Sequence, residues 1–202
     1  MYSVKKGNDF ENTVYDIINK LLLDNQLIVP PNFTKIFKKK NYFSRDRNDF
    51  ITVDISLEVT HPNADTYSLL IIVECKDYNH PIPVDDIEEF VSKIDQIAGK
   101  NVKAIFVTTN SLQKSALEYA KSKGIAVLRI LPDSQVQYIL YQMSPIYSSN
   151  KAFLNENKQS LKALTIEDYI GDNQNTYGYV DGIFLSEINE IFNHYLMKFK
   201  IV

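Results

Sequence analysis

The sequence predicts an α/β fold in which a central mixed sheet, made of an antiparallel hairpin and the parallel strands of βαβ units, is flanked by helices. Residues 50–76 contain two strand patterns separated by a turn. Residues 84–131 then alternate between helical and strand patterns, the order that produces parallel strands with right-handed crossovers. A hydrophobic content of 45% provides enough apolar surface for an ordinary core.

The composition excludes several classes of protein. The 202 residues suffice for one sizeable domain, or for one domain with an appendage. Because the net charge is -3, contact with a polyanion needs a local basic cluster. The single cysteine, Cys75, excludes a disulfide framework and a cysteine-based zinc site, and it favours a reducing cytoplasm. We expect no membrane association, since no segment has the pattern of a signal peptide or a bilayer span.

The first predicted element is an amphipathic helix that opens at Gly7 and Asn8 and ends near Asp24. Its apolar face consists of Phe10, Val14, Ile17, Ile18, Leu21 and Leu22. Asn8 is suited to cap this helix, and Glu11, three residues later, fits a capping box. Glu11 therefore has two interpretations, a capping residue or an acidic group of a functional site.

The densest positive charge lies between residues 33 and 47, where aromatic residues are interleaved with it. The basic residues are Lys35, Lys38, Lys39, Lys40, Arg45 and Arg47. Lysines of this kind can protect a strand edge from aggregation. Alternatively, they contact a phosphate backbone, where counterion release favours binding. The second interpretation predicts a nucleic-acid-binding surface.

A hairpin follows the basic segment. Residues 50–59 alternate, with one face formed by Val53, Ile55, Leu57 and Val59 and the other by Asp54, Ser56 and Glu58. Residues 61–66 have turn composition. Residues 67–76 then form an apolar run typical of a strand buried on both faces, and this strand ends in Glu74 and Lys76. Antiparallel pairing would place Asp54 near Glu74.

The charged end of the second strand indicates a functional site, because a carboxylate and an ammonium are costly to bury unless they are paired or bind an ion. The simpler alternative is an ordinary salt bridge, since Glu-x-Lys occurs by chance about once in such a chain. Asp54 and Glu74 would supply hard oxygen ligands for Mg²⁺ or Mn²⁺, and the carbonyl oxygen of Cys75 could add a third. Lys76 would orient a water or stabilise negative charge on a phosphate.

Asp49 and Glu58 are alternatives to Asp54 as the first acid. Asp49 precedes the alternating segment, and Glu58 lies on the same predicted face as Asp54 but farther along the strand. The three histidines show no spacing typical of metal ligands.

The rest of the predicted core consists of a helix over 85–98, a strand over 102–108, a helix that starts near Asn110 and stops at Gly124, and a strand over 125–131. Beyond residue 131 the pattern weakens. We expect a strand or short helix over 136–143, a polar linker over 148–160, a helix over 161–170, a hairpin over 177–185 and a final helix capped by Ser186. We therefore divide the chain into a core, 1–131, and a smaller α+β appendage, 132–202, which packs on the core or mediates oligomerisation.

Several of these motifs resemble those of the PD-(D/E)xK nuclease superfamily, and in particular its Mrr-like, restriction-endonuclease-like branch. The motifs are Gly7-x-x-Phe10-Glu11, Val53-Asp54-Ile55-Ser56 and Val73-Glu74-Cys75-Lys76. The resemblance continues through 104–109, 116–120 and 124–128, and covers about residues 7–131. One departure is that no proline immediately precedes Asp54.

This resemblance implies a restriction-endonuclease-like sheet and Mg²⁺-dependent cleavage of DNA. Asp54 and Glu74 would be metal ligands and Lys76 the catalytic lysine. Glu11 would correspond to the acid of the first helix that borders the metal site. Gln96 would correspond to a glutamine that faces the site in some relatives.

We therefore expect a metal-dependent DNA endonuclease, a phosphodiester hydrolase that acts in restriction or defence against foreign DNA. One alternative is a non-cleaving DNA-binding or assembly module of the same fold. Another is a nuclease subunit of a larger recombination or transposition complex. Cleavage of both strands of a duplex would favour a homodimer or a partner subunit.

Overall fold

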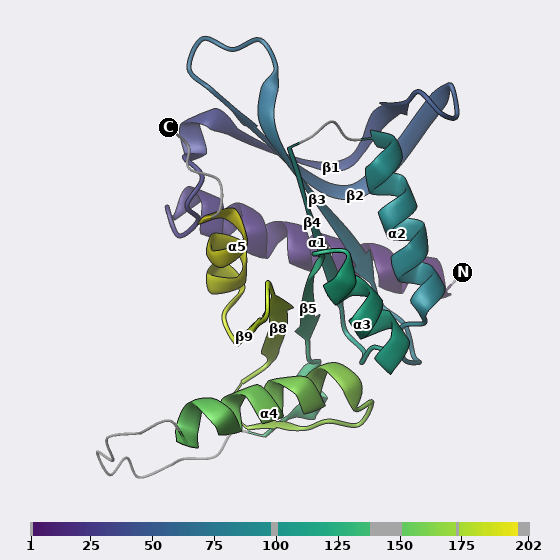
Figure 1. The fold of residues 1–202 in the computed structure, drawn as a ribbon, viewed down its shortest axis with the longest axis vertical. Coiled ribbons are helices and arrows are strands. Elements are labelled where there is room, and N and C mark those ends of the chain that lie inside the picture. The colour runs from purple at the N-terminus through teal and green to yellow at the C-terminus, as the bar shows by residue number, and fades with distance from the viewer. Residues whose placement is uncertain (1, 98–100, 138–150, 173, 198–202) are drawn as a thin grey trace.

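The computed structural model describes residues 2–97, 101–137, 151–172 and 174–197. Within these ranges, a seven-stranded mixed sheet with strand order β1-β2-β3-β4-β5-β8-β9 forms the centre of the molecule (Figure 1). Its strands are β1 (Thr34–Ser44), β2 (Asp49–Thr60), β3 (Tyr67–Lys76), β4 (Val102–Thr108), β5 (Ala126–Ile130), β8 (Thr176–Val180) and β9 (Ile183–Leu185). Strands β3, β4 and β5 are parallel, and the other neighbouring pairs are antiparallel. The predicted fold class is confirmed.

Helices cover both faces of the sheet. They are α1 (Tyr2–Leu23), α2 (Val84–Ile97), α3 (Lys114–Ser122), α4 (Lys151–Thr165) and α5 (Ile188–Met197). One hydrophobic core joins α1 and α5 to one face, with Ile18 and Phe192 fully buried. A second core joins α2 and α3 to the other face, with Phe90 and Ala116 fully buried. Figure 1 shows α1 behind the sheet and α2 and α3 in front of it.

Short elements complete the fold. They are the 3-10 turns η1 (Pro31–Phe33) and η2 (Asp133–Gln135), and the strands β6 (Val136–Gln137) and β7 (Gly171–Asp172), which pair with each other. The predicted hairpin over 177–185 is confirmed. Its turn residues, Asp181 and Gly182, have φ values of 49° and 94°, as expected for an Asp-Gly turn between two strands.

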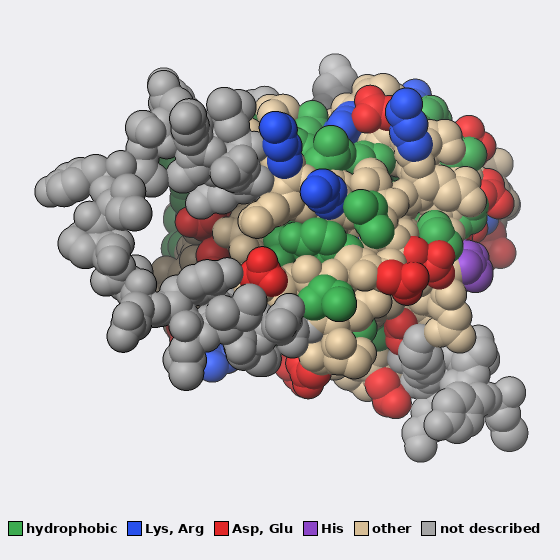
Figure 2. Space-filling view, turned by 90° about the horizontal axis from the view of Figure 1, so that it is seen from below, with side chains coloured by type: hydrophobic (Ala, Val, Ile, Leu, Met, Phe, Trp, Pro, Cys, Tyr) green, Lys and Arg blue, Asp and Glu red, His purple; other side chains and the backbone are tan. Residues whose placement is uncertain are grey.

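The described residues beyond 131 are closely joined to the predicted core. Strand β8 pairs with β5 and extends the sheet, and β9 pairs with β8. The apolar stripe of α5 is buried in the core that contains α1. Figure 2 views the molecule from the end where α4 lies, and shows hydrophobic side chains on that face among separate basic and acidic groups. The C-terminal segment therefore completes the sheet and one of its covering layers.

Two local predictions are wrong, and one segment without a predicted element forms a strand. Helix α1 begins at Tyr2, so Asn8 lies inside it and does not cap it. Residues 151–160, predicted as a polar linker, belong to α4, which is stabilised by burial of Ala163 and Leu164 near its end. Residues 34–44 form the long strand β1, because pairing with β2 outweighs their lysine-rich composition. The sequence offers two interpretations of their lysines, as protection of a strand edge or as contacts to nucleic acid, without assigning an element. Residues 138–143 and 148–150 lie outside the described residues.

The buried guanidinium of Arg129 holds α4 against the sheet. Arg129 lies on β5 and is fully buried. Its five hydrogen bonds go to the carbonyl oxygens of Thr109, Ala163, Ile166 and Glu167 and to Oε1 of Gln135, at 2.6–3.2 Å. Burial lowers the pKa of Arg129 to about 10, which leaves the side chain charged at neutral pH.

We expect the substitution Arg129→Lys to lower the free energy of unfolding by roughly 2–4 kcal/mol, because an ammonium cannot reproduce the planar array of five donors and leaves buried carbonyls without partners. Urea unfolding followed by circular dichroism measures the loss. The control is Arg45→Lys at an exposed position of the β1–β2 turn. Equal unfolding midpoints for the two variants would contradict the role assigned to Arg129.

Candidate functional site

The acidic residues predicted for the site lie where β2 and β3 separate. The pairing of these strands runs from Thr60 opposite Tyr67 to Ile55 opposite Val73. At the next position, the backbone N–H of Cys75 donates to Oδ2 of Asp54 at 2.8 Å. A side-chain oxygen thus takes the place of a carbonyl oxygen in the ladder, and Asp54 is held between the two strands.

Strand β1 is irregular at the same level. Lys38 lies opposite Ile55 and Lys40 opposite Val53, so that Lys39 lies opposite Asp54. Lys39 has a φ of 52°, in the left-handed region. The prediction that Val53 shares a face with Ile55 is wrong, because Val53 packs in the core that contains α2, whereas Ile55 packs in the core that contains α1. The irregularity at Asp54 and Lys39 accounts for this change of face.

A lysine joins two of the predicted acids. The ammonium of Lys39 lies 2.7 Å from Oε1 of Glu11 and 2.7 Å from Oδ1 of Asp54. Both carboxylates are largely buried, with side-chain exposures of 12% for Glu11 and 15% for Asp54. Glu11 therefore contributes to the acidic site, and the capping interpretation is wrong.

Glu74 is the most deeply buried acid of the group. Oε1 of Glu74 accepts a hydrogen bond from the ammonium of Lys93 on α2 at 2.8 Å, while the ammonium of Lys76 lies 3.8 Å away. Oε2 of Glu74 is buried and has no hydrogen-bond partner among the described residues. Burial raises the pKa of Glu74, and the charge of Asp54 raises it further, whereas the two lysines lower it. The environment therefore disfavours the ionised carboxylate.

Lys76 is held by α2. Its ammonium lies 3.1 Å from Oδ1 of Asp86 and 3.5 Å from the hydroxyl oxygen of Tyr78, and that hydroxyl donates to Asp86. Burial by itself would lower the pKa of Lys76, but the hydrogen bond to Asp86 and the charge of Glu74 outweigh it and raise the pKa. Lys76 is therefore a cation at neutral pH.

Gln96 makes its contacts away from the acidic residues of the site. Its Oε1 accepts hydrogen bonds from Nε of Arg47 at 2.6 Å and from the hydroxyl of Ser44 at 3.3 Å. Its Nε2 donates to the carbonyl oxygen of Ser92. These bonds join α2 to the end of the β1–β2 hairpin, and none of them reaches Asp54 or Glu74.

The predicted basic cluster is only partly available for a ligand. Lys38 donates to the side chain of Asn12, and Lys40 forms an ion pair with Glu58 at 2.6 Å. Lys35 and Arg45 are exposed and make no ion pair with a described residue. Glu58 is thus engaged by Lys40, and Asp49, the other alternative to Asp54, accepts a hydrogen bond from the neighbouring N–H of Phe50.

Sequence reasoning missed two residues of the site, Lys93 and Asp86. Both lie on α2, the helix that connects β3 to β4. Their positions in the sequence resemble those of ordinary charged residues on the exposed side of a helix. Only the packing of α2 against the end of β3 brings them to Glu74 and Lys76.

The donor set fits a divalent cation, although no group of three or more His, Cys, Asp or Glu side chains in the described ranges is arranged as a complete site. Asp54 and Glu74 provide hard oxygen atoms, and Oε2 of Glu74 lacks a partner. The contact of Lys39 with Glu11 and Asp54 shows that the adjoining oxygens attract a cation. The residues that could hold a metal are therefore Asp54 and Glu74.

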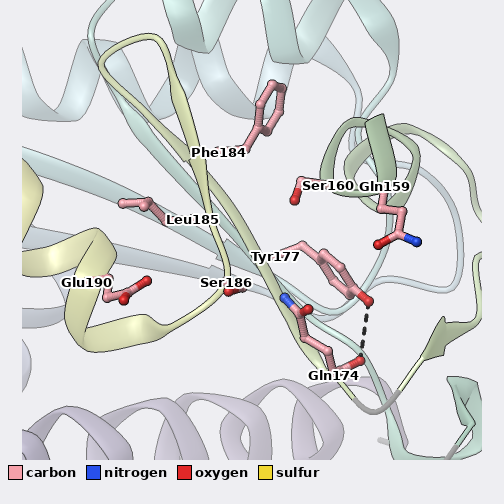
Figure 3. A pocket seen from close by; sticks show the side chains of 8 residues that line it. All are labelled: Gln159, Ser160, Gln174, Tyr177, Phe184, Leu185, Ser186 and Glu190. Carbon is pink, nitrogen blue, oxygen red and sulfur yellow. Dashed lines mark hydrogen bonds between the residues drawn. The ribbon is translucent and has the colours of Figure 1, made fainter. Parts of the chain in front are cut away.

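Two hollows lie away from these acids. One, of about 410 Å³, lies beside the carboxyl ends of the parallel strands and is lined by Tyr78, Thr109 and Arg129 among others. The other, of about 200 Å³, lies between α4, the β8–β9 hairpin and α5 (Figure 3). In Figure 3, the hydroxyl of Tyr177 points to the backbone of Gln174, where it donates to the carbonyl oxygen at 3.5 Å. Neither hollow is lined by Asp54 or Glu74.

Residues 34–130 match the family described as restriction endonuclease. The matched segment runs from β1 to β5 and includes Asp54, Glu74 and Lys76. The fold and the match define a restriction-endonuclease-like nuclease domain. The match covers 97 of the 202 residues and is consistent with the Mrr-like branch of the PD-(D/E)xK nuclease superfamily.

Other comparisons are less informative. No curated protein matches the chain. A solved structure described as a protein of unknown function, AF1548, aligns with a TM-score of 0.40 and 14% identity over 55% of this chain and 53% of that chain. The alignment therefore spans about half the length of that protein. Among the described residues, no helix combines the length and hydrophobicity needed to cross a membrane.

We expect the ion pair between Lys93 and the buried Glu74 to contribute measurably to the stability of the fold. In the absence of metal, Lys93→Ala should lower the free energy of unfolding by roughly 1–3 kcal/mol, because it removes the nearest cation from a buried carboxylate. Urea unfolding in EDTA measures this change. A matched control is Lys121→Ala on α3, since Lys121 is about as exposed as Lys93, at 21% and 19%, but its partner Glu118 is 61% exposed. An equal loss in both variants would contradict this account.

Proposed function

We propose that this protein is a metal-dependent DNA endonuclease that hydrolyses phosphodiester bonds in restriction or defence against foreign DNA. The observation that carries the proposal is the unpartnered, buried Oε2 of Glu74 beside Asp54, within the segment that matches the restriction endonuclease family. An ionised carboxylate in this environment is unfavourable in free energy unless a cation binds to it. The family description supports the assignment to DNA and to restriction.

In this proposal Asp54 and Glu74 would hold Mg²⁺ or Mn²⁺, together with the backbone carbonyl oxygen of Cys75. The bound ion would supply Lewis-acid chemistry, which polarises a phosphoryl oxygen and lowers the pKa of a water molecule. Lys76 stabilises the negative charge that develops on the phosphate, because its ammonium stays protonated beside Glu74. Asp86 and Tyr78 hold that ammonium in place.

The proposed DNA-binding surface is the basic side of β1 and the β1–β2 turn. Lys35 and Arg45 are exposed there and available to contact phosphates. Lys38, Lys39, Lys40 and Arg47 would need to give up internal contacts before they could do the same. Double-strand cleavage would further require a second copy of the chain or a partner subunit. The single, buried cysteine is consistent with action in a reducing cytoplasm.

Cleavage of supercoiled plasmid tests the proposed activity. We expect nicking or linearisation with Mg²⁺ or Mn²⁺ and none with EDTA. Asp54→Asn, Glu74→Gln and Lys76→Met should each lower the rate by about 100-fold or more, because the first two remove a metal ligand and the third removes the cation that stabilises the developing charge. The matched control is Glu58→Gln on the same strand as Asp54, since Glu58 pairs with Lys40 and not with the site.

Metal binding separates the possible results of this assay. Mn²⁺ binding that is lost in Glu74→Gln, without cleavage of plasmid, would indicate a different substrate or a missing partner and would contradict activity of the isolated chain on DNA. Absence of both cleavage and Mn²⁺ binding would overturn the enzyme assignment and favour a non-cleaving module of the same fold.

The salt dependence of binding to a short duplex in EDTA tests the DNA surface. We expect Lys35→Ala and Arg45→Ala each to weaken binding for all sequences and to reduce the slope of log K against log salt by about 0.9, because each removes one phosphate contact. Fluorescence anisotropy measures both quantities. Lys123→Ala, an exposed charge after α3, serves as the control. An unchanged slope in both β1–β2 variants would exclude this surface.

A further inference from the structure

Lys39 has an unusual backbone for its position. The other non-glycine residues with positive φ in the described ranges are Asn25, Asn48, Asn63 and Asp181, which lie in turns and are of types that tolerate this conformation. Lys39 has a φ of 52° inside strand β1. For a residue with a long side chain this conformation costs about 1–2 kcal/mol. Surrounding interactions must stabilise it, and such outliers are concentrated at functional sites.

In this conformation, the ammonium of Lys39 makes two ionic contacts. It contacts Glu11 on α1 and Asp54 on β2 at equal distances of 2.7 Å. In its absence, two largely buried carboxylates would face each other without a cation. The neighbouring Lys38 cannot substitute for it in this arrangement, since its ammonium is bound to Asn12. Lys39 therefore supplies the cation that Glu11 and Asp54 share in the metal-free protein.

We propose that Lys39 is a positioning residue that holds Glu11 and Asp54 together and competes with the divalent metal, which displaces its ammonium on binding. This inference rests on the proposed function, because it concerns the same metal site. Oδ1 of Asp54, the atom bound to Lys39, is the one that remains for a metal, since Oδ2 accepts the N–H of Cys75. A divalent ion offers this atom a higher charge than an ammonium does.

The side chain of Lys39 is suited to leave the site. It is 43% exposed, and it is joined to the rest of the protein only through the two carboxylates among its described contacts. By contrast, the ammonium groups of Lys76 and Lys93 are more buried, with side-chain exposures of 17% and 19%, and each also contacts an acid of α2. Lys39 is therefore the cation of the site that can move into solvent most readily.

Direct measurement of Mn²⁺ binding by electron paramagnetic resonance tests this competition. In the wild type, Mn²⁺ binds only to the form in which the Lys39 ammonium has left the carboxylates. The apparent affinity is reduced by the fraction of that form, so Lys39→Asn, which has no ammonium to displace, should bind Mn²⁺ about tenfold more tightly than the wild type. Asparagine is chosen because it tolerates the left-handed backbone without supplying a charge. Lys39→Arg, which keeps the charge, should retain the wild-type affinity. Lys35→Asn removes an equal charge from the same strand and should change the affinity by less than about twofold.

Chemical labelling of lysines gives a second measurement. Acetylation by a limiting amount of acetic anhydride, analysed by mass spectrometry of peptides, should modify Lys39 at least about threefold faster when saturating Mg²⁺ is present, because the displaced side chain then lies in solvent, where the reagent can reach it. The rate at Lys35 should not change. The comparison uses the intact chain in both conditions.

The outcomes distinguish this inference from the proposed function. Equal Mn²⁺ affinities of the wild type and Lys39→Asn, or a labelling rate of Lys39 that does not respond to Mg²⁺, would overturn the role of Lys39 and leave the metal site intact. Absence of Mn²⁺ binding in both proteins would overturn the metal site and the role of Lys39 together.

Discussion

The hydrogen bond from the N–H of Cys75 to the carboxylate of Asp54 is the contact on which the site depends. It ends the regular pairing of β2 and β3 and replaces a ladder carbonyl by a charged side chain. Because β3 continues beside β4 after this point, Glu74 and Lys76 stay fixed by the parallel part of the sheet. The antiparallel hairpin and the parallel strands therefore meet at the acidic residues, and each part of the sheet supplies one of them.

Charge balance explains why so many elements converge here. Glu11 comes from α1, Asp54 from β2, Glu74 from β3 and Asp86 from α2, and three lysines, from β1, β3 and α2, contact these four acids. Buried carboxylates without such partners would destabilise the fold. Four carboxylates therefore face three ammonium groups, and Oε2 of Glu74 has no partner among the described residues. A site that is nearly neutral without metal and still has one unpartnered oxygen can be stable and remain able to bind a cation.

The C-terminal segment supports the site from a distance. Strand β8 protects the edge of β5, and α5 completes the core that also holds α1, the helix that carries Glu11. Arg129 connects the carboxyl end of β5 to the end of α4 through backbone carbonyl groups. These contacts keep the sheet and the first helix in fixed relation. The position of Glu11 thus depends on residues beyond 131 as well as on those near it in the sequence.

The sequence by itself determined the local elements, since hydrophobic periodicity and turn residues are local properties. The alternation around Asp54, the apolar run before Glu74 and the Asp181-Gly182 turn predicted β2, β3 and the β8–β9 hairpin. The order of helices and strands likewise predicted the parallel part of the sheet. Local patterns could also bring Asp54 near Glu74, because adjacent antiparallel strands have a definite register.

Only the tertiary structure decided which charges meet. The contacts of Lys39 with Glu11, of Lys93 with Glu74 and of Gln96 with Arg47 join residues that are 28, 19 and 49 positions apart. No local pattern encodes them, because they depend on how helices pack across the sheet. The left-handed backbone of Lys39 and the change of face at Val53 could not be predicted from the sequence either, since the composition of β1 and β2 is compatible with regular strands. The sequence therefore determined the types of group available to the site, and packing determined their pairing.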